Sequence, residues 1–303
     1  MDVESRPPIP PGPWLVVGLE RSGAACARAL WSRGEPVIGV DSAEPAQAQA
    51  LRQEGIEIVT ATDGVEELGR ARAVVRSPGV PNEAAVLVAA RAAGIPIYSE
   101  LELGWRMLES PFVAVTGTNG KTTTVELLGE IWRAAGQPVA VAGNVGTAVS
   151  SLVGQIGPET TVICEASSFQ LENSVAFAPE AAVFLNIAPD HLDRHGDFES
   201  YRLAKLNLFA FQGPDEVAIG PPSLLEQAGG GARRISVTSD AAVSADLELR
   251  DGLICWQGTA LMPAGEVRLR GAHNLDNALS AAAAALSSGI DAKAVVTTLR
   301  KFT

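Results

Sequence analysis

The sequence predicts an α/β protein with a parallel, doubly wound sheet followed by a second α/β sheet. Short apolar runs alternate with helical patterns along most of the chain, which is typical of doubly wound sheets. A glycine-rich stretch, "TGTNGKTTT", directly follows one apolar run in the middle of the chain. The 303 residues also exceed what one hydrophobic core usually fills, so we expect two domains.

The first alternation begins with the apolar run "WLVVG", which is followed by the helical stretch "SGAACARALWSRG". Next come "PVIGVD", closing on Asp41, then "IEIVT", "ARAVVRSPGVPN", the helical "EAAVLVAARAAG" and "IPIYS". Ser99 and Glu102 have capping-box spacing, so "SELELGWRMLE" is expected to be a helix that runs up to Pro111. We therefore predict a Rossmann-like parallel-sheet domain over residues 1–110.

A second alternation fills residues 111–303. It comprises "FVAVT", a helix to about Ala135, the strands "PVAVAGN", "TTVICE" and "AAVFLN", and a helix around "FESYRLAKLNLFAF". The segment from "DEVAIG" to "GEVRLRG" suggests short strands joined by turns, and "HNLDNALSAAAAALSSG" is helical by its alanine content. "DAKAVVTTLRKFT" begins a further helix. We predict a central α/β domain similar to that of P-loop NTPases.

Composition narrows the class of protein. The formal net charge of −12 and the pI near 4.8 repel nucleic acid and anionic lipid, so we expect neither as a partner. The chain has no apolar run long enough for a membrane helix, and its first residues are acidic and proline-rich. We expect a cytoplasmic protein without a signal peptide. Cys26, Cys164 and Cys255 lack paired spacing and are expected to be reduced and buried.

The glycine-rich stretch has the pattern of a phosphate-binding loop. Gly117 and Gly120 let backbone amides turn toward a phosphate, and the helix that follows adds partial positive charge. Lys121 would lie along the β and γ phosphates, and the Thr122 hydroxyl would ligate magnesium. Val115 replaces the first glycine of the usual pattern, which leaves a shortened G-x-x-G-K-T loop. An ordinary glycine turn with a surface lysine is the alternative, and we favour nucleotide binding.

Polar residues follow three other apolar runs of the second alternation. Glu165 ends "TVICE", Asn144 follows "VAVAG", and Asn186 leads to Asp190 and His191. Because the carboxyl ends of parallel strands meet at one sheet edge, these residues are expected to lie near the phosphate loop. Glu165 could accept a magnesium ion directly or through water, and it could equally be a solvated residue just past a strand.

Two histidines in this region leave the metal open. His191 and His195, with Asp190 and Asp193, could suggest a zinc site. Oxygen-rich surroundings beside a phosphate loop suit magnesium better, and a hydrogen-bonded loop histidine fits the pattern equally well.

The residue pattern around Lys205 does not by itself indicate a functional role. It shares one helical face with Tyr201 and Leu208. Residue types alone predict that its ammonium extends into solvent.

The first domain has part of a dinucleotide-binding fingerprint. Gly18, Gly23 and Asp41 have the expected spacing, but Glu20 stands where the middle glycine should let backbone approach a pyrophosphate. Nicotinamide binding is therefore a poor fit. A structural turn, or a uridine nucleotide held at the same edge, remains as an alternative.

Together these motifs resemble the Mur ligase family, most closely its D-glutamate-adding MurD type. The resemblance rests on "TGTNGKTTT", "AGNVG", "EASSFQLE", "FLNIAPDHLDRHGDFESYRLAK" and "GAHNLDNALSAAAAA", with "RSPGVPNE" and "GIPIYSELELGW" in the first domain. It covers nearly the whole chain. Family members carry a third, C-terminal ligase domain after the helix that follows "HNLDNAL", and we expect this chain to lack it and to turn over poorly.

The resemblance implies ATP-dependent addition of D-glutamate to UDP-N-acetylmuramoyl-L-alanine through an acyl phosphate. That reaction belongs to peptidoglycan precursor synthesis, and so to cell-wall formation, cell shape and cell division. The implied partners are the UDP substrate, D-glutamate, ATP and Mg²⁺, and the implied state is a monomer. Another Mur-type or folylpolyglutamate-type amide ligase, a P-loop kinase or phosphatase, and a nicotinamide-binding module remain as alternatives.

The resemblance also assigns roles to residues. It implies an ATP-binding set of Gly117, Thr118, Asn119, Gly120, Lys121, Thr122, Thr123, Asn274 and Asn277. It implies catalytic roles for Lys121, Glu165, His191 and Lys205, and metal ligation by Thr122, Glu165, His191 and a carbamylated Lys205. Contacts to the UDP substrate are implied for Arg21, Ser22, Asp41, Ser77, Gly79, Asn144 and Ser167.

Overall fold

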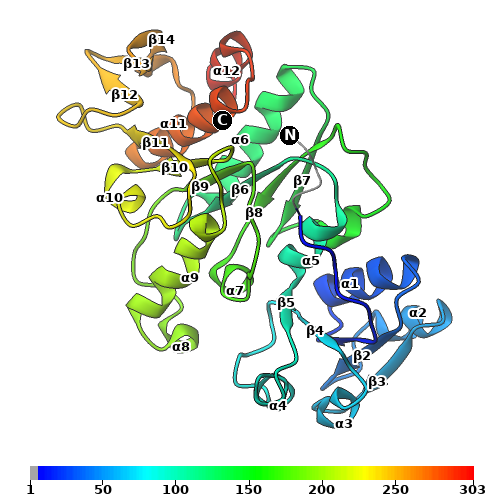
Figure 1. The fold of residues 1–303 in the computed structure, drawn as a ribbon. Coiled ribbons are helices and arrows are strands. Elements are labelled where there is room, and N and C mark those ends of the chain that lie inside the picture. Colours follow the sequence, from blue (N-terminus) through cyan, green and yellow to red (C-terminus); the bar gives the residue numbers. More distant parts are fainter. Residues whose placement is uncertain (1–5) are drawn as a thin grey trace. The chain divides into compact units, whose positions relative to one another are not determined.

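A computed structural model describes residues 6–303, apart from the side chain of Ala272, and shows two compact α/β units (Figure 1). The first unit contains residues up to Glu109 together with the segments Gly146–Ile156 and Phe169–Ala176. The second contains Ser110–Val145, Gly157–Ser168 and Phe177–Thr303. The predicted α/β class is confirmed, and the predicted parallel sheet is found in the first unit.

The sheet of the first unit is fully parallel, and its strand order is β3-β2-β1-β4-β5. The order reverses direction between β1 and β4, which is where ligands bind in open α/β sheets, beyond the carboxyl ends of the strands. The strands are β1 (Trp14–Val17), β2 (Val37–Asp41), β3 (Glu57–Thr60), β4 (Ala73–Arg76) and β5 (Ile97–Ser99).

Helices cover both faces of this sheet. Trp14 and Val16 of β1 pack with residues of α1 and α5, whereas Leu15 and Val17 pack with residues of α3 and α4. This alternation follows from the two-residue period of a strand and explains the continuous apolar run in the sequence. The elements are α1 (Arg21–Ser32), α2 (Ala48–Gln53), α3 (Val65–Leu68), α4 (Ala85–Ala92), α5 (Glu100–Met107) and the short 3₁₀ helix η2 (Val149–Leu152).

Helix α5 begins as predicted and ends earlier. The Ser99 hydroxyl accepts a hydrogen bond from the Glu102 backbone N–H at 3.2 Å, which satisfies an otherwise unpaired donor of the first turn. The helix was expected to run up to Pro111 and instead ends at Met107. Leu108 already has extended dihedral angles and is buried, so packing of its side chain stops the helix before the proline does.

The sheet of the second unit is mixed, in the order β14-β13-β12-β11-β10-β9-β6-β8-β7. The pairs from β7 to β12 are parallel, and β12, β13 and β14 pair antiparallel. The strands are β6 (Phe112–Thr116), β7 (Val139–Gly143), β8 (Thr161–Glu165), β9 (Ala181–Phe184), β10 (Val217–Gly220), β11 (Arg233–Thr238), β12 (Leu247–Arg250), β13 (Leu253–Trp256) and β14 (Thr259–Pro263).

The two faces of this sheet are also covered. Val113 and Val115 of β6 belong to one core with α6 and α11, while Phe184 of β9 meets Phe209 of α9, with ring centroids 6.2 Å apart. The small side chains of the alanine run let helix α11 lie close to its neighbours, and the run is fully buried as a result. The helices are α6 (Lys121–Ala134), α7 (Ser168–Leu171), α8 (Leu192–His195), α9 (Phe198–Ala210), α10 (Pro222–Leu225), η3 (Ala264–Glu266), α11 (Ala272–Ser287) and α12 (Ala292–Leu299).

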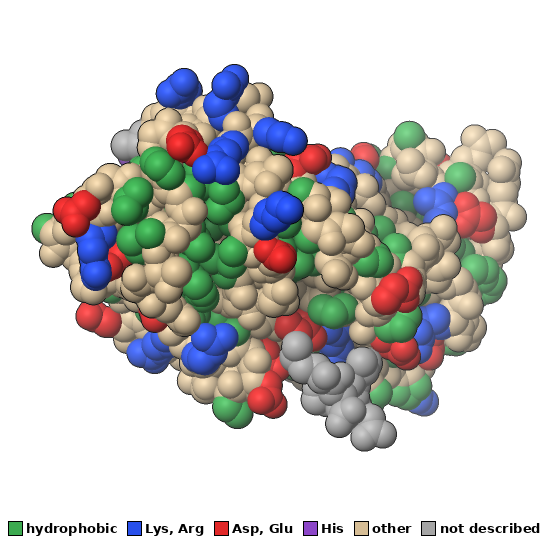
Figure 2. Space-filling view, turned by 90° about the horizontal axis from the view of Figure 1, so that it is seen from above, with side chains coloured by type: hydrophobic (Ala, Val, Ile, Leu, Met, Phe, Trp, Pro, Cys, Tyr) green, Lys and Arg blue, Asp and Glu red, His purple; other side chains and the backbone are tan. Residues whose placement is uncertain are grey.

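The surface and the cysteines agree with the composition. On the face drawn in Figure 2, acidic and basic side chains both occur, separated by small groups of hydrophobic side chains. None of the helices described within residues 6–303 is long and apolar enough to cross a membrane. Cys26, Cys164 and Cys255 are buried, as predicted, and none of them forms a disulfide within the described residues.

The close approach of α1 to the β1 turn generates a test of the fold. A Cβ atom at Gly23 would lie 1.7 Å from the Gly18 carbonyl oxygen and 2.6 Å from the Ser77 hydroxyl. We expect Gly23→Ala to lower the free energy of unfolding by about 2 kcal/mol or more, because the helix must move off the strand. Urea denaturation followed by circular dichroism measures this change.

Gly69→Ala is the matched control for this prediction. Gly69 has helical dihedral angles, and nothing lies within 4 Å of its added Cβ. Its free energy of unfolding should stay within about 0.5 kcal/mol of wild type. Equal midpoints for the two variants would show that α1 does not need the glycine.

Candidate functional site

The glycine-rich loop joins β6 to α6 and requires glycine at its last position. Gly120 has φ +87°, and an added Cβ would lie 2.3 Å from Oδ1 of Asn277, a buried residue of α11. No side chain can be placed there without moving α11 or the loop. Asn277 donates to Asn274 Oδ1 at 3.2 Å, and Asn274 donates to the Arg270 carbonyl oxygen at 2.8 Å. Both predicted nucleotide-contacting asparagines are therefore hydrogen-bonded, and Asn277 lies against the loop.

A second element fixes the same loop from the neighbouring strand. Asn186, just after β9, accepts from the Thr118 N–H at its carbonyl, at 3.0 Å, and from the Asn119 N–H at its side-chain oxygen, at 2.9 Å. Its amide also donates to the Asn119 carbonyl oxygen at 3.0 Å. The Thr118 hydroxyl accepts from the Ala188 N–H at 3.0 Å. Sequence analysis missed this support, and its only signal was a polar residue ending a strand next to β6.

Thr122, Glu165 and Asn144 come together at the carboxyl ends of three strands. The Thr122 hydroxyl donates to Glu165 Oε2 at 2.7 Å, and the Asn144 side chain donates to Glu165 Oε1 at 3.1 Å. Glu165 is 4% exposed, so the alternative of a solvated carboxylate is wrong. Gly143 allows this packing, because a Cβ there would lie 2.3 Å from the Glu165 carbonyl oxygen.

This trio fits a magnesium ion. Because the Thr122 hydroxyl hydrogen points at Glu165, the lone pairs of its oxygen stay available to a cation. Hydroxyl and carboxylate oxygens are ligands that Mg²⁺ accepts, usually together with water and phosphate oxygens. Across residues 6–303, His, Cys, Asp and Glu form no group of three or more that could hold a metal ion.

Lys121 and Lys205 share one acceptor in the loop. Lys121 Nζ donates to the carbonyl oxygens of Gly117 and Thr118, each at 3.0 Å. Lys205 Nζ donates to the same Gly117 oxygen at 2.8 Å and lies 4.8 Å from the centroid of the Tyr201 ring. Lys205 is 2% exposed, so the expectation of a solvated ammonium is wrong. Lys121, at the start of α6, and Lys205, in α9, therefore both bind the backbone of the phosphate loop.

This arrangement changes the acid–base properties of Lys205. Burial, followed by the nearby charge of Lys121, lowers the pKa of Lys205 from its usual 10.5 to about 7. The carboxylates of Asp190 and Glu165 partly offset this effect. A substantial share of the side chain is therefore a neutral amine near neutral pH, which is the nucleophilic form.

The two histidines differ in their surroundings. His191 has a half-exposed side chain and φ +51°, and its Nε2 lies 3.5 Å from Asp190 Oδ2. His195 Nε2 lies 2.9 Å from the Ser168 hydroxyl. Both rings face Tyr201, at centroid distances of 6.3 and 5.3 Å. His195 is thus a hydrogen-bonded histidine at the end of α8, and His191 keeps a ring that solvent can reach.

In the first unit, predicted contacts gather at the switch point of the sheet. Asp41 accepts from the Leu19 N–H at 2.7 Å and from the Ala43 N–H at 2.9 Å, which fixes the direction of its carboxylate. The Ser77 hydroxyl donates to the Gly18 carbonyl oxygen at 2.6 Å. These bonds tie the ends of β1, β2 and β4 together and give the turn a structural role.

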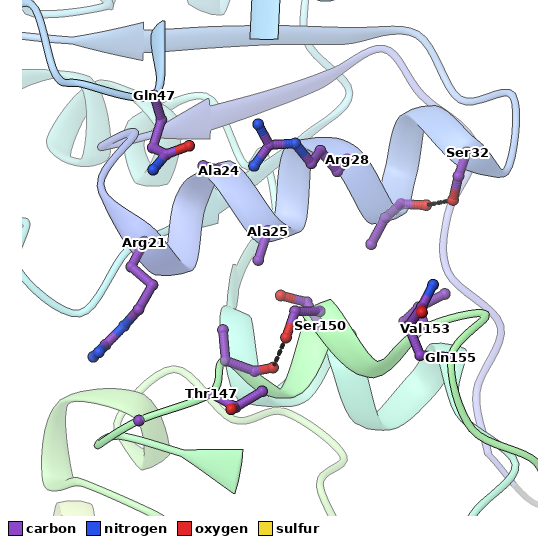
Figure 3. Close-up of a pocket in the computed structure, with 14 residues that line it drawn as sticks. Arg21, Ala24, Ala25, Arg28, Ser32, Gln47, Thr147, Ser150, Val153 and Gln155 are labelled. Carbon is purple, nitrogen blue, oxygen red and sulfur yellow. Dashed lines mark hydrogen bonds between the residues drawn. The ribbon is translucent and has the colours of Figure 1, made fainter. Parts of the chain in front are cut away.

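The other residues predicted for this region lie around the same turn. Glu20 is exposed and has φ −64°, so the backbone at this position does not require glycine. Arg21 and Ser22 open α1, and Gly79 lies in the turn after β4. Figure 3 shows Arg21 beside a cavity of about 560 Å³ between α1 and the segment around Thr147.

Comparison with known proteins assigns the family. A model of the Mur ligase middle domain matches residues 115–285, and a model of the MurD-like N-terminal domain matches residues 13–99. The chain belongs to the Mur ligase family. The resemblance predicted from the loop and strand-end motifs is confirmed.

Curated members of this Mur ligase family match most of the chain. The UDP-N-acetylmuramoylalanine–D-glutamate ligase of Pelotomaculum thermopropionicum is 39% identical over 302 residues, which are 95% of this chain and 66% of that protein. The enzyme of the same name from Acidobacterium capsulatum is 39% identical over 307 residues, with the same coverage. The chain thus spans slightly less than two thirds of the length of these relatives.

Solved Mur ligase structures share the fold. The UDP-N-acetylmuramate:L-alanyl-gamma-D-glutamyl-meso-diaminopimelate ligase of Neisseria meningitides has a TM-score of 0.61 at 19% identity, over 96% of this chain and 98% of that one. A murein peptide ligase from Psychrobacter arcticus has a TM-score of 0.60 at 19% identity, over 96% and 68%. At these identities the likeness establishes the fold alone.

The Thr122–Glu165 hydrogen bond generates a prediction about metal-dependent nucleotide binding. Thr122→Val removes the hydroxyl and keeps the shape of the side chain, so we expect affinity for a non-hydrolysable ATP analogue with Mg²⁺ to fall about tenfold. Thr122→Ser keeps the hydroxyl and should bind within about threefold of wild type, less than 0.7 kcal/mol. Calorimetric titration with and without Mg²⁺ measures both. An unchanged Mg²⁺ dependence in Thr122→Val would contradict the assignment.

Proposed function

We propose that this chain takes part in ATP-dependent addition of D-glutamate to UDP-N-acetylmuramoyl-L-alanine, a step of peptidoglycan precursor synthesis. Two relatives that are 39% identical to the chain are UDP-N-acetylmuramoylalanine–D-glutamate ligases, which supports this substrate choice. The observation that carries the proposal is the pair of lysines on the Gly117 carbonyl oxygen, beside a buried Glu165 that holds Thr122. Such a cluster suits a site that collects negative charge from phosphates and a carboxylate.

In this proposal the second unit, within residues 111–303, holds ATP. Backbone from Gly117 to Gly120 and the first residues of α6, including Thr123, would surround the phosphates at a helix N-terminus. Lys121 would stabilise charge on the transferred phosphoryl group. Asn277 supports the loop directly, and Asn274 supports Asn277.

The proposed reaction has two chemical steps. The terminal carboxylate of the L-alanyl group attacks the γ-phosphorus of ATP, forming an acyl phosphate and releasing ADP. The D-glutamate amine then attacks the activated carbonyl carbon, and the tetrahedral intermediate expels phosphate as the amine loses a proton. The residues of the loop orient the phosphates and offset their charge, which accounts for most of phosphoryl-transfer catalysis.

Magnesium would support this chemistry by neutralising charge between the carboxylate and the triphosphate. Thr122 and Glu165 would hold one ion, consistent with the orientation of the Thr122 hydroxyl. His191 and a modified Lys205 are the proposed residues for a second ion. The half-exposed ring of His191 leaves it able to take a ligand.

Lys205 is proposed to carry a carbamate. Its neutral amine attacks carbon dioxide, a C–N bond forms, and the nitrogen loses a proton to solvent, so that a cation becomes an anion. The lowered pKa, caused by burial and Lys121, favours the required neutral form. The anion would also relieve repulsion between the two lysines.

In this proposal residues 1–110, nearly all of which belong to the first unit, hold the UDP part of the substrate. Arg21, Ser22, Asp41, Ser77 and Gly79 are the proposed contacts of the uridine and pyrophosphate, and they lie around the switch point of the sheet. Asn144 and Ser167, near the ends of β7 and β8, are the proposed contacts of the remainder of the substrate. The exposed Glu20 side chain can turn to solvent, away from a pyrophosphate.

Substrate binding tests this function. Calorimetric titration should show that the chain binds UDP-N-acetylmuramoyl-L-alanine and does not bind NAD. Arg21→Ala should weaken the UDP substrate about tenfold through loss of a charge-assisted hydrogen bond to the pyrophosphate. Arg33→Ala, at the other end of α1, is the matched control and should bind like wild type.

Each outcome of that titration has a meaning. Binding of the UDP substrate that Arg21→Ala weakens and Arg33→Ala does not would support the proposed site. Binding of NAD alone would replace it with a nicotinamide-binding function. Failure of a folded wild-type chain to bind the UDP substrate would overturn the proposal.

The carbamate proposal predicts a pH dependence. Below pH 7 Lys205 is an ammonium without a lone pair, and above pH 7 it is an amine, so carbamate formation at a fixed concentration of dissolved carbon dioxide should rise between pH 6 and 8. ¹³C NMR of metal-free protein with labelled bicarbonate should show a carbamate signal that grows as the pH rises from 6 to 8. Lys205→Met should lack this signal. The same signal in Lys205→Met would place the carbamate elsewhere.

A further inference from the structure

A buried carboxylate, Glu100, holds two separate segments of the chain within the first unit. Its side chain is 0% exposed and lies in the first turn of α5. Oε1 accepts from the Ser150 N–H at 2.7 Å and from the Ser150 hydroxyl at 2.9 Å. Oε2 accepts from the Gln170 side chain at 3.4 Å. One oxygen therefore holds Gly146–Ile156, and the other holds Phe169–Ala176.

Neighbouring residues of α5 strengthen the same attachment. Glu102, also 0% exposed, accepts from the Val175 and Ala176 N–H groups at 3.3 and 3.4 Å and pairs with Arg106. At Gly104 an added Cβ would lie 2.7 Å from Val149 Cγ1, so α5 and η2 are in close contact. Helix α5 thus binds both segments through two buried carboxyl groups, whose oxygens are costly to leave without hydrogen bonds.

The residues just before these two segments meet in the second unit. Gly146–Ile156 follows β7 and Asn144, and Phe169–Ala176 follows β8, Glu165 and Ser167. Asn144 and Glu165 bond to each other through side chain and backbone, at 3.1 and 2.9 Å. Ser150 is six residues after Asn144, and Gln170 is five residues after Glu165. Each segment is therefore bound by Glu100 in the first unit, and a residue just before it is hydrogen-bonded in the second unit.

We propose that Glu100 is a positioning residue that couples the occupancy of the UDP-substrate site in the first unit to the Asn144–Glu165 pair and hence to Mg²⁺-nucleotide binding. This inference rests on the proposed function. Glu100 touches neither ligand in the proposal and acts through the two short connections. A change of the first unit that moves α5 must move Ser150 and Gln170 together, and the connections transmit that movement to Asn144 and Glu165.

Coupling of this kind is reciprocal and measurable. In wild type, saturating UDP-N-acetylmuramoyl-L-alanine should change the affinity for a non-hydrolysable ATP analogue with Mg²⁺ by at least about fivefold, and the reverse experiment should give the same factor. Glu100→Leu removes all acceptors and should bring this factor close to one. Glu100→Gln keeps an acceptor for Ser150 and an amide that can pair with Gln170, so it should recover most of the coupling.

A second readout separates coupling from simple loss of stability. Hydrogen exchange of Glu100→Leu should become faster in 146–156 and 169–176 together, while the strands of both sheets keep their protection. Gln170→Leu breaks the bond to one oxygen and should speed exchange mainly in 169–176, with partial loss of coupling. Glu57→Gln, which removes the charge of an exposed carboxylate paired with Arg70 in the same unit, should leave both readouts unchanged.

The outcomes distinguish this inference from the proposed function. If wild type binds both ligands with no mutual effect, or if folded Glu100→Leu keeps the wild-type factor, the coupling role is overturned and the function stands. If Glu100→Leu fails to fold, wild-type coupling in Gln170→Leu overturns the role in the same way. If wild type does not bind the UDP substrate, the proposed function falls, and the inference falls with it.

Discussion

Two positively charged side chains compete for one carbonyl oxygen at the centre of the second unit. Lys121 and Lys205 both donate to Gly117, and Lys205 has almost no contact with solvent. Two ammonium groups cannot share such a position without cost, because burial disfavours each charge and each repels the other. Burial and the charge of Lys121 therefore lower the pKa of Lys205. Two lysine side chains close together also favour the binding of an anion at the loop. The surrounding elements hold the loop and both lysines in this arrangement.

Those surrounding elements come from distant parts of the sequence. Asn186 fixes the loop from the β9 side, Asn277 closes on Gly120 from α11, and Glu165 holds Thr122 from β8. Glu165 and Asn277 are buried, so two of these three supports hold the loop from the interior of the unit. The free energy of ordering is supplied during folding, which is the usual advantage of a preorganised site.

Sequence patterns predicted much of this architecture for a physical reason. Apolar runs of a parallel sheet are buried on both faces and easily seen, and glycines before Lys121 carry a specific loop conformation. The environment of single polar residues was harder to predict. Lys205 and Glu165 appear in the sequence as residues that could be solvated, and both are buried, because burial depends on what other elements place over them. The end of α5 at Met107 was missed for a related reason, since the packing of Leu108 overrode the proline signal.

The alanine run of α11 has a consequence for how this protein can vary. Residues Ala281 to Ala285 are all fully buried, and single methyl groups set the spacing between the helix and the strands. Asn277 lies one turn before that run, and its amide lies against Gly120. A bulkier residue in the alanine run would shift α11 and move the Asn277 amide away from Gly120. Tolerance to substitution in α11 should therefore be lowest along this alanine run, which begins one turn after Asn277.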